Sequence, residues 1–362
     1  MKAVIACGGT GGHLFPGLAV GEVLVQRGWE VLVIISEKEI DALAIQGRKE
    51  FQFEKVQSIG MPAVLSPGIF AFSVRFLRSI AHCRRMFSKF KPDIVLGMGG
   101  FTSTPPIMAG KLKGIPTFVH ESNAIPGKAN KLTAHFASSV LLGLADCATY
   151  FPGKKTEVTG TPIRAGLKKK VDRAAVYAQL GLDAAKKTIL IMGGSQGARG
   201  INHAILQALP FFVDQPIQLV HLTGPNGEVE VRTQFEKSGV SGYIAPFYHQ
   251  MEELYAIADF AVARSGAASL SELSYFGIPS ILIPYPYAAE DHQTFNARIF
   301  EQAGAAVLLK ESDATGETLS KMILEFLNDP DKKASMSKQS RLLSPEDAAS
   351  RVADTLERSL IK

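Results

Sequence analysis

The sequence is poor in cysteine and has no arrangement of cysteines that suggests a metal site. Its three cysteines, Cys7, Cys83 and Cys147, are an odd number in apolar surroundings. This favours a reducing compartment over a secreted fold held by disulfides. No Cys-x-x-Cys pair or Cys/His cluster occurs. The cysteines therefore give no indication of a metal site.

Long hydrophobic runs are also missing. The first apolar stretch, residues 3–7, is too short for the core of a signal peptide. No later run reaches the roughly 18 apolar residues that a spanning helix needs. The chain has 362 residues, of which 46% are apolar and 20% charged. These values predict about two globular domains and no transmembrane segment.

Two common nucleotide-binding fingerprints are absent. The pattern G-x-G-x-x-G fails at the first glycine cluster because Leu14 stands where its last glycine would be. No G-x-x-x-x-G-K-[ST] loop occurs. This excludes a P-loop protein and leaves a dehydrogenase unsupported.

The sequence does contain two related glycine turns. Gly8-Gly9-Thr10-Gly11-Gly12-His13 follows an apolar run that predicts a strand over residues 2–7, and residues 193–200 follow a second such run at 187–192. A helical pattern begins after each turn. Unpaired N–H groups and the helix dipole make such a turn a site for anions. The repetition predicts two nucleotide-binding domains.

Strands and helices alternate along both halves, which predicts parallel, doubly wound sheets. We expect an N-terminal domain over residues 1–165 and a C-terminal domain over 166–344, with a linker region at 151–173. A final helix within 345–362 is expected to pack on the first domain. Besides the two runs that precede the glycine turns, the predicted strands are 31–35, 51–56, 94–96, 117–119, 217–222, 241–245, 259–263, 279–283 and 304–308.

The first half is basic. Residues 1–165 hold 19 Lys/Arg and 11 Asp/Glu, whereas residues 166–362 hold 20 and 23. This suits an anionic partner such as phosphate, nucleic acid or anionic lipid. Within this half, residues 70–91 predict a helix with three stripes. One contains Phe72, Phe76, Ile80, Cys83 and Phe87; the second Phe70, Val74, Leu77 and Ala81; the third Arg75, Arg78, His82, Arg85 and Lys89.

Two interpretations of this helix remain open. A helix docked by one apolar stripe would leave the other beside a cationic face, which fits insertion into an anionic membrane surface. Alternatively, the helix is well buried and its arginines are merely solvated.

Several polar residues at predicted strand ends are candidate site residues. His13 stands at a helix start, where the dipole favours the neutral imidazole that a general base needs; a capping role is the alternative. Glu272, in a first helical turn, could accept both hydroxyls of a ribose or simply pair with the helix dipole. Gln293 and Asn296 share a helix face and could bind sugar hydroxyls, or belong to an ordinary helix start.

Together these motifs resemble the MurG family of bacterial glycosyltransferases over nearly the whole chain. The resemblance rests on residues 8–19, 97–101, 193–198 and 264–267, on His120-Glu121-x-Asn123, and on His292-Gln293-x-x-Asn296-Ala297. It implies a glycosyltransferase-B fold: two Rossmann-like domains with a cleft between them.

The resemblance also implies an activity. The family moves N-acetylglucosamine (GlcNAc) from UDP-GlcNAc to the 4-hydroxyl of undecaprenyl-pyrophosphoryl-MurNAc-pentapeptide, converting lipid I to lipid II in peptidoglycan synthesis. It inverts the anomeric centre and uses no metal or cofactor. It acts at the cytoplasmic face of the cell membrane, so the implied partners are these two substrates and an anionic membrane surface, with no nucleic acid.

Site roles carry over from the resemblance residue by residue. His13 would be the base, Gly99 and Gly100 would hold the acceptor pyrophosphate, and the 70–91 helix would contact the membrane through Phe70, Phe72, Phe76, Arg75, Arg78 and Arg85. Substrate would be bound by Thr10, Gly11, Gly12, Asn123, Arg164, Ser195, Tyr248, Arg264, Ala267, Ala268, Ser269, Leu270, Ser271, Glu272, Gln293 and Asn296.

Other functions on this architecture stay open. A UDP-GlcNAc 2-epimerase would share the donor but needs no membrane helix, and a glycolipid synthase acting on diacylglycerol needs no pyrophosphate cradle. A non-catalytic binding subunit is disfavoured because both predicted turns are present. A dehydrogenase is the weakest alternative.

Overall fold

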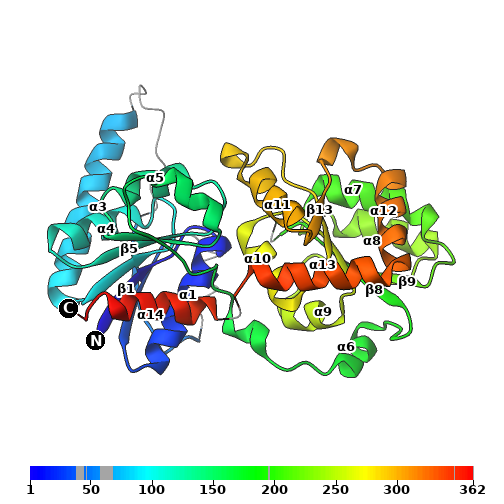
Figure 1. The fold of residues 1–362 in the computed structure, drawn as a ribbon, viewed down its shortest axis with the longest axis horizontal. Helices are drawn as coiled ribbons and strands as arrows, with labels where there is room; N and C mark the ends of the chain where they lie inside the picture. Colours follow the sequence, from blue (N-terminus) through cyan, green and yellow to red (C-terminus); the bar gives the residue numbers. More distant parts are fainter. Residues whose placement is uncertain (38–44, 46, 58–67, 195, 346, 362) are drawn as a thin grey trace. The chain divides into compact units, whose positions relative to one another are not determined.

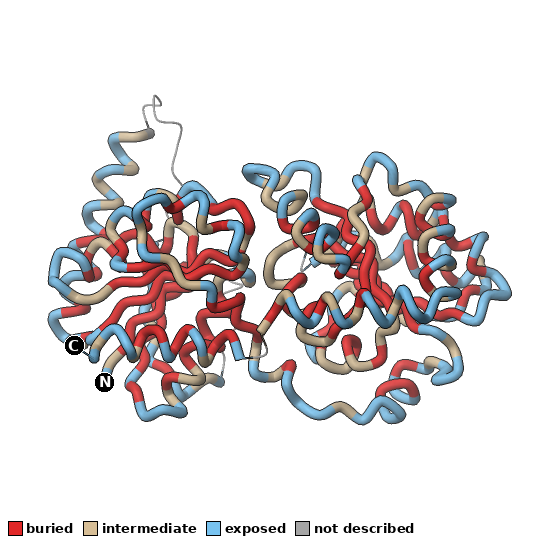
Figure 2. The backbone as a smooth tube through the Cα atoms, viewed as in Figure 1, coloured by how far each residue is buried: buried red, intermediate tan, exposed pale blue. Residues whose placement is uncertain are grey.

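The computed structural model describes residues 1–37, 45, 47–57, 68–194, 196–345 and 347–361 (Figure 1). The chain divides into two compact α/β units, Met1–Arg164 with Glu346–Lys362, and Ala165–Pro345. In each unit the central strands are buried and the outer helices and loops carry most of the exposed backbone (Figure 2).

The first unit is built on a parallel sheet of seven strands. Their order is β3-β2-β1-β4-β5-β6-β7, so the order reverses between β1 and β4, where open α/β sheets bind ligands beyond the carboxyl ends. The strands are β1 (Lys2–Ala6), β2 (Glu30–Ile35), β3 (Gln52–Lys55), β4 (Ile94–Gly97), β5 (Thr117–Glu121), β6 (Ser139–Leu142) and β7 (Thr156–Val158).

Helices cover both faces of this sheet, because successive side chains of a buried strand point to opposite sides. Ala3 and Ile5 of β1 lie in one apolar cluster, and Val4 and Ala6 lie in another. The first cluster includes α1 and α14 and the second includes α3 and α4. The helices are α1 (Gly11–Gln26), α3 (Gly68–Phe90), α4 (Thr104–Leu112), α5 (Lys128–Ala134) and α14 (Ala348–Arg358), with a 3₁₀ helix η1 (Ala145–Tyr150).

The second unit repeats this plan. Its six parallel strands have the order β10-β9-β8-β11-β12-β13, which reverses between β8 and β11. The strands are β8 (Lys187–Met192), β9 (Ile217–Leu222), β10 (Gly242–Ala245), β11 (Phe260–Ala263), β12 (Ser280–Leu282) and β13 (Ala306–Leu308). The helices are α6 (Arg173–Leu180), α7 (Arg199–Ala208), α8 (Glu228–Ser238), α9 (Met251–Ile257), α10 (Ala267–Phe276), α11 (His292–Gln302), α12 (Gly316–Asn328) and α13 (Pro330–Leu343), with 3₁₀ helices η2 (Ala165–Lys168), η3 (Leu209–Phe211), η4 (Ala289–Asp291) and η5 (Glu311–Asp313).

Every predicted strand is present, but two strands were not predicted. β6 is only four residues long, and β7 lies inside the segment expected to be a linker. β7 is the edge strand, and none of its three residues, Thr-Glu-Val, is buried. Its sequence therefore has no apolar alternation from which a strand could be predicted. The predicted linker therefore begins inside the first unit.

The last helix, α14, belongs to the core of the first unit. Val352 and Leu356 are buried in the cluster that includes α1. At the surface, Arg27 Nη1 contacts Asp354 Oδ1 at 2.6 Å and Glu357 Oε2 at 2.7 Å. The Trp29 indole also donates to Glu357, at 3.1 Å. The chain thus returns to its first domain for its final helix.

We expect Leu356→Ala to lower the free energy of unfolding of the first unit by about 2–5 kcal/mol, because it empties a fully buried site. Urea unfolding monitored by circular dichroism measures the change. Arg351→Ala, on the exposed side of the same helix, is the control and should cost less than about 0.5 kcal/mol. Equal losses for the two variants would contradict the packing of α14.

Candidate functional site

The glycine turns after β1 and β4 of the first unit lie against each other. Gly9 has φ +108°, and a Cβ placed on it would stand 3.4 Å from Thr102 Oγ1. The Ser103 hydroxyl is 2.9 Å from the Ala6 carbonyl and 2.7 Å from the Gly99 carbonyl, and it accepts the Gly99 N–H at 3.2 Å. This hydroxyl joins the ends of the two strands at which the sheet order reverses.

His13 lies where these turns meet. Gly99 and Gly100 have φ of +114° and +71°, and a Cβ on Gly99 would be 2.9 Å from the His13 ring. Only glycine combines this backbone with room for the ring. His13 Nδ1 is 3.2 Å from Thr10 Oγ1. The structure thus assembles the predicted base, Thr10 and the predicted pyrophosphate turn.

Glu121, at the end of β5, organises the next loop and was not among the predicted site residues. Its buried carboxylate accepts four hydrogen bonds. Oε1 binds the backbone N–H and side-chain amide of Asn123 at 2.9 and 3.0 Å, and Oε2 binds the Gly127 N–H at 3.1 Å and Asn130 Nδ2 at 2.8 Å. The sequence signal was a carboxylate directly after a buried strand. It did not distinguish a ligand contact from this organising role.

His120 beside it is fully buried and neutral. Burial lowers its pKa, although hydrogen bonding to the Gly160 carbonyl opposes that shift. Because a carbonyl only accepts, His120 Nε2 carries the proton that it donates to Gly160 at 2.9 Å. Nδ1 is then the acceptor for the Ser122 hydroxyl at 3.3 Å. This arrangement ties β5 to the segment that follows β7.

Arg164, a predicted substrate-binding residue, lies near the first glycine turn. Its guanidinium is 4.8 Å from the centre of the Phe15 ring. A Cβ on Gly11 would be 3.3 Å from that same ring. The first unit thus brings together Thr10, Gly11, Gly12, His13, Gly99, Gly100 and Arg164.

In the second unit the turn after β8 packs against the turn after β9. A Cβ on Gly197, whose φ is +73°, would come within 2.2 Å of the Thr223 carbonyl oxygen. This contact requires glycine and fixes the path of the turn into α7. Ser195, predicted to bind the donor phosphates, lies outside the described residues.

The helix α10 follows β11 and carries the predicted substrate-binding residues 267–272, of which only some have side chains at the surface. Ala267, Ala268 and Ser269 are partly exposed at its start. Leu270 and Ser271, predicted to bind substrate as well, do not have their side chains at this exposed start. Leu270 is buried in the domain, and the Ser271 hydroxyl donates to the Ala267 carbonyl at 2.9 Å. Helical rotation turns both inward.

Glu272, on the next turn of α10, is held by a partner that the sequence did not indicate. The hydroxyl of Tyr255, in α9, donates to Glu272 Oε2 at 2.6 Å. Tyr248, whose backbone was predicted to read the base, has its side chain buried. Its hydroxyl donates to Glu253 at 2.5 Å and accepts from Gln179 at 3.1 Å.

The predicted sugar-binding residues have different surroundings. Gln293 is partly exposed in the first turn of α11. Asn296 is fully buried, and its side chain donates to the Ser265 carbonyl at 3.0 Å. Arg264 is also buried, with its guanidinium on backbone carbonyls of the protein. Only Gln293 of these three presents its side chain at the surface.

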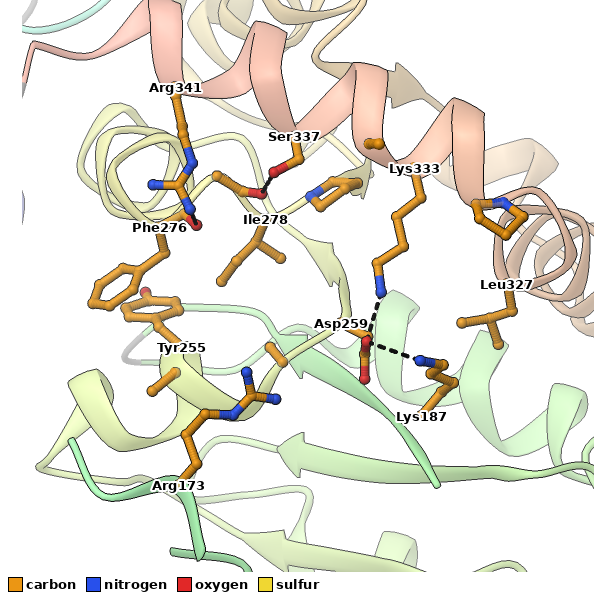
Figure 3. A pocket seen from close by; sticks show the side chains of 16 residues that line it. Arg173, Lys187, Tyr255, Asp259, Phe276, Ile278, Leu327, Lys333, Ser337 and Arg341 are labelled. Atoms are coloured by element: carbon orange, nitrogen blue, oxygen red, sulfur yellow. Dashed lines mark hydrogen bonds and ion pairs between the residues drawn. The ribbon is translucent and has the colours of Figure 1, made fainter. Parts of the chain in front are cut away.

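A cavity of about 560 Å³ in the second unit lies at the other edge of the sheet (Figure 3). In Figure 3, Lys187 and Lys333 point toward Asp259, with Nζ–Oδ1 distances of 3.7 and 2.5 Å. Burial works to raise the pKa of Asp259, but hydrogen bonds from Lys333 and the Thr188 N–H outweigh it, and the pKa is lowered. Lys187 and Asp259 stand at the starts of β8 and β11, so this cavity is separate from the turns at the strand ends.

The two apolar stripes of α3 differ in exposure. Phe72 and Phe76 are only partly exposed; their rings stack at 5.6 Å, Phe72 contacts Phe101, and Phe76 packs on the core cluster. Their stripe meets the core, because it continues into the buried Phe87. The exposed apolar side chains are Phe70 (76%) and Leu77 (64%). The exposed cations of the same helix include Arg75, Arg78 and Arg85.

Among the described residues, every helix is too short or too polar to span a bilayer. The same residues also hold no group of three or more His, Cys, Asp or Glu side chains suited to a metal ion.

The sequence matches a known glycosyltransferase family in both units. Residues 3–142 match the Glycosyltransferase family 28 N-terminal domain, and residues 188–354 match the Glycosyltransferase family 28 C-terminal domain. A Halothermothrix orenii protein named UDP-N-acetylglucosamine--N-acetylmuramyl-(pentapeptide) pyrophosphoryl-undecaprenol N-acetylglucosamine transferase is 38% identical, over 99% of this chain and 98% of the relative. A Geobacter sulfurreducens protein of the same name is 36% identical over the full length of both.

Solved structures agree with this match. MurG of Acinetobacter baumannii superposes with a TM-score of 0.79 at 26% identity, covering 99% of both chains. UDP-GlcNAc 2-epimerase of Neisseria meningitidis, at 16% identity and a TM-score of 0.72 over 99% of this chain and 100% of that one, shares the fold alone. The predicted two-domain, Rossmann-like architecture is confirmed. From its full-length match to these transferases, the chain belongs to the MurG family of glycosyltransferases and has their glycosyltransferase-B fold.

Proposed function

We propose that this protein transfers GlcNAc from UDP-GlcNAc to the 4-hydroxyl of undecaprenyl-pyrophosphoryl-MurNAc-pentapeptide, the step from lipid I to lipid II. The observation that carries the proposal is the 38% identity, over nearly the whole chain, to a protein named for this transfer. An epimerase is not favoured, because that similarity, at 16% identity, extends to the fold alone.

The first unit has the groups that the acceptor side of the reaction needs. His13 stands against Gly99 and Gly100, and a turn without side chains lets a pyrophosphate approach its backbone closely. As the acceptor 4-hydroxyl attacks the anomeric carbon, His13 takes its proton. The bond from that carbon to UDP breaks, and attack from the opposite side inverts the centre.

The second unit has the groups that the donor side needs. Ala198 precedes the start of α7, and Gly266 precedes the start of α10. Free N–H groups and the helix dipoles at both starts favour the charge that develops on departing UDP. Glu272, held by Tyr255, is the proposed ribose contact, and no metal is required.

The direct test mixes the purified protein, UDP-GlcNAc and a short-chain pyrophosphoryl-MurNAc-pentapeptide lipid. We expect equimolar UDP and β-linked disaccharide lipid by mass spectrometry and NMR, and the same rate with EDTA present. Free GlcNAc epimers in place of the disaccharide would show an epimerase. Loss of activity in EDTA would contradict the metal-free scheme.

We expect His13→Ala to lower kcat at least about 10²-fold, the usual contribution of a general base. His135→Ala, which changes an exposed histidine directly after α5 and far from the turns in sequence, serves as the control and should keep wild-type turnover. Steady-state kinetics with both substrates saturating measures kcat. Wild-type turnover in His13→Ala would remove His13 as the base.

We further propose that α3 places the enzyme on the anionic inner surface of the cell membrane. Phe70 and Leu77 are exposed on one side of the helix, and Arg78 and Arg85 flank them on the exposed arc. Apolar side chains can enter the acyl boundary while the cations bind anionic headgroups. This arrangement suits an acceptor anchored by an undecaprenyl chain.

Phe70→Ser with Leu77→Ser should weaken binding to phosphatidylglycerol vesicles at least about tenfold, because two exposed apolar side chains no longer enter the bilayer. Vesicle sedimentation measures the binding, and phosphatidylcholine vesicles should bind the wild type poorly. Val229→Ser with Leu342→Ser, which removes two equally exposed apolar residues of the second unit, is the matched control. Similar loss in both double variants would contradict a specific role for α3.

A further inference from the structure

Arg264, directly after β11, uses its guanidinium to hold the segment that follows β12. It is 7% exposed. Nη1 donates to the carbonyls of Ile283 and Pro284 at 3.0 and 2.9 Å, and Nη2 pairs with Glu311. The guanidinium also lies 5.5 Å from the centre of the Tyr285 ring. Both terminal nitrogens are thus engaged by the protein itself.

The segment held by Arg264 in turn holds Gln293. The Tyr285 N–H donates to the side-chain oxygen of Gln293 at 2.9 Å. A backbone N–H can only donate, so the amide atom that faces it must be Oε1. Nε2, with its two hydrogens, therefore points away from Tyr285, and among the described residues it has no recorded acceptor. The Gln293 carbonyl accepts from the Ser265 hydroxyl at 2.8 Å, which fixes its backbone as well.

We propose that Arg264 is a positioning residue that orients the Gln293 carboxamide, with Nε2 outward, toward the sugar of the donor. Gln293 would then donate to an oxygen of the sugar, in a hydroxyl or in the acetamido carbonyl, and would not accept from a sugar hydroxyl. This inference rests on the proposed function, because it deepens the role of Gln293 in binding UDP-GlcNAc.

The same geometry argues against the simpler role of Arg264 as a phosphate ligand. A forked contact of both terminal nitrogens with the diphosphate would require the side chain to leave two carbonyls and a carboxylate inside the protein. Those groups would then be buried without their donor, which is unfavourable. Holding Gln293 in advance, in contrast, reduces the side-chain entropy that is lost when the sugar binds.

Arg264→Lys tests the proposal, since lysine keeps the charge but cannot make the same forked contacts. We expect the KM for UDP-GlcNAc to rise about tenfold, the effect of losing one oriented hydrogen bond. Inhibition by UDP, which lacks the sugar, should stay within about twofold of wild type. In a Gln293→Ala background, Arg264→Lys should have little further effect, because the group it positions is gone.

Two further variants separate the amide orientation from folding. Gln293→Glu keeps an acceptor for the Tyr285 N–H but replaces the outward donor by an acceptor. It should therefore raise the KM for UDP-GlcNAc as much as Gln293→Ala does. Tyr285→Pro removes the N–H, whereas Tyr285→Ala keeps it. The difference between their KM values for UDP-GlcNAc isolates that one bond and stays informative if Arg264→Lys fails to fold.

The inference is overturned if Arg264→Lys weakens inhibition by UDP as much as it raises the KM for UDP-GlcNAc. It is also overturned if the KM increases of Arg264→Lys and Gln293→Ala multiply in the double variant, or if Gln293→Glu retains the wild-type KM. Equal KM values for Tyr285→Pro and Tyr285→Ala would also overturn it. All four outcomes require a wild-type enzyme that transfers GlcNAc. A wild type without transfer would instead reject the proposed function.

Discussion

The whole arrangement depends on backbone segments approaching closer than a side chain would allow. A Cβ on Gly17 would lie 2.4 Å from the Cys7 Cβ, so α1 can rest on β1 only with glycine there. The same constraint lets His13 stand on Gly99 and lets Gly197 meet the turn after β9. The glycines therefore serve packing first.

Two buried charged side chains organise the loops around these turns. Glu121 binds four N–H donors that follow β5, and Arg264 binds carbonyls that follow β12. Each charge satisfies backbone groups that a loop would otherwise leave unpaired at a strand end. Each unit thus has a buried charged side chain that binds the backbone after a strand, a carboxylate in the first unit and a guanidinium in the second. In the first unit the loop held by Glu121 lies beside Gly99, which contacts His13, and in the second unit the segment held by Arg264 binds Gln293.

The α3 helix shows where sequence patterns reach their limit. Periodicity correctly separated two apolar stripes from a basic one, but it could not choose which apolar stripe meets the core. Phe87 and Cys83 pack in the core cluster that includes α4, and Phe76, on the same stripe, packs against that cluster. Phe70 and Leu77 remain outside for that reason.

The sequence alone was enough to predict two parallel α/β domains, their strands apart from β6 and β7, and the grouping of functional residues at strand ends. These features follow from local periodicity, glycine turns and the chemistry of particular residues. Tertiary structure decided which of these side chains are buried and which groups of the protein they bind. Leu270 turns inward, Arg264 binds carbonyls of its own chain, and Glu121 becomes the organiser of a loop. Such outcomes depend on partners distant in sequence, which no local pattern specifies.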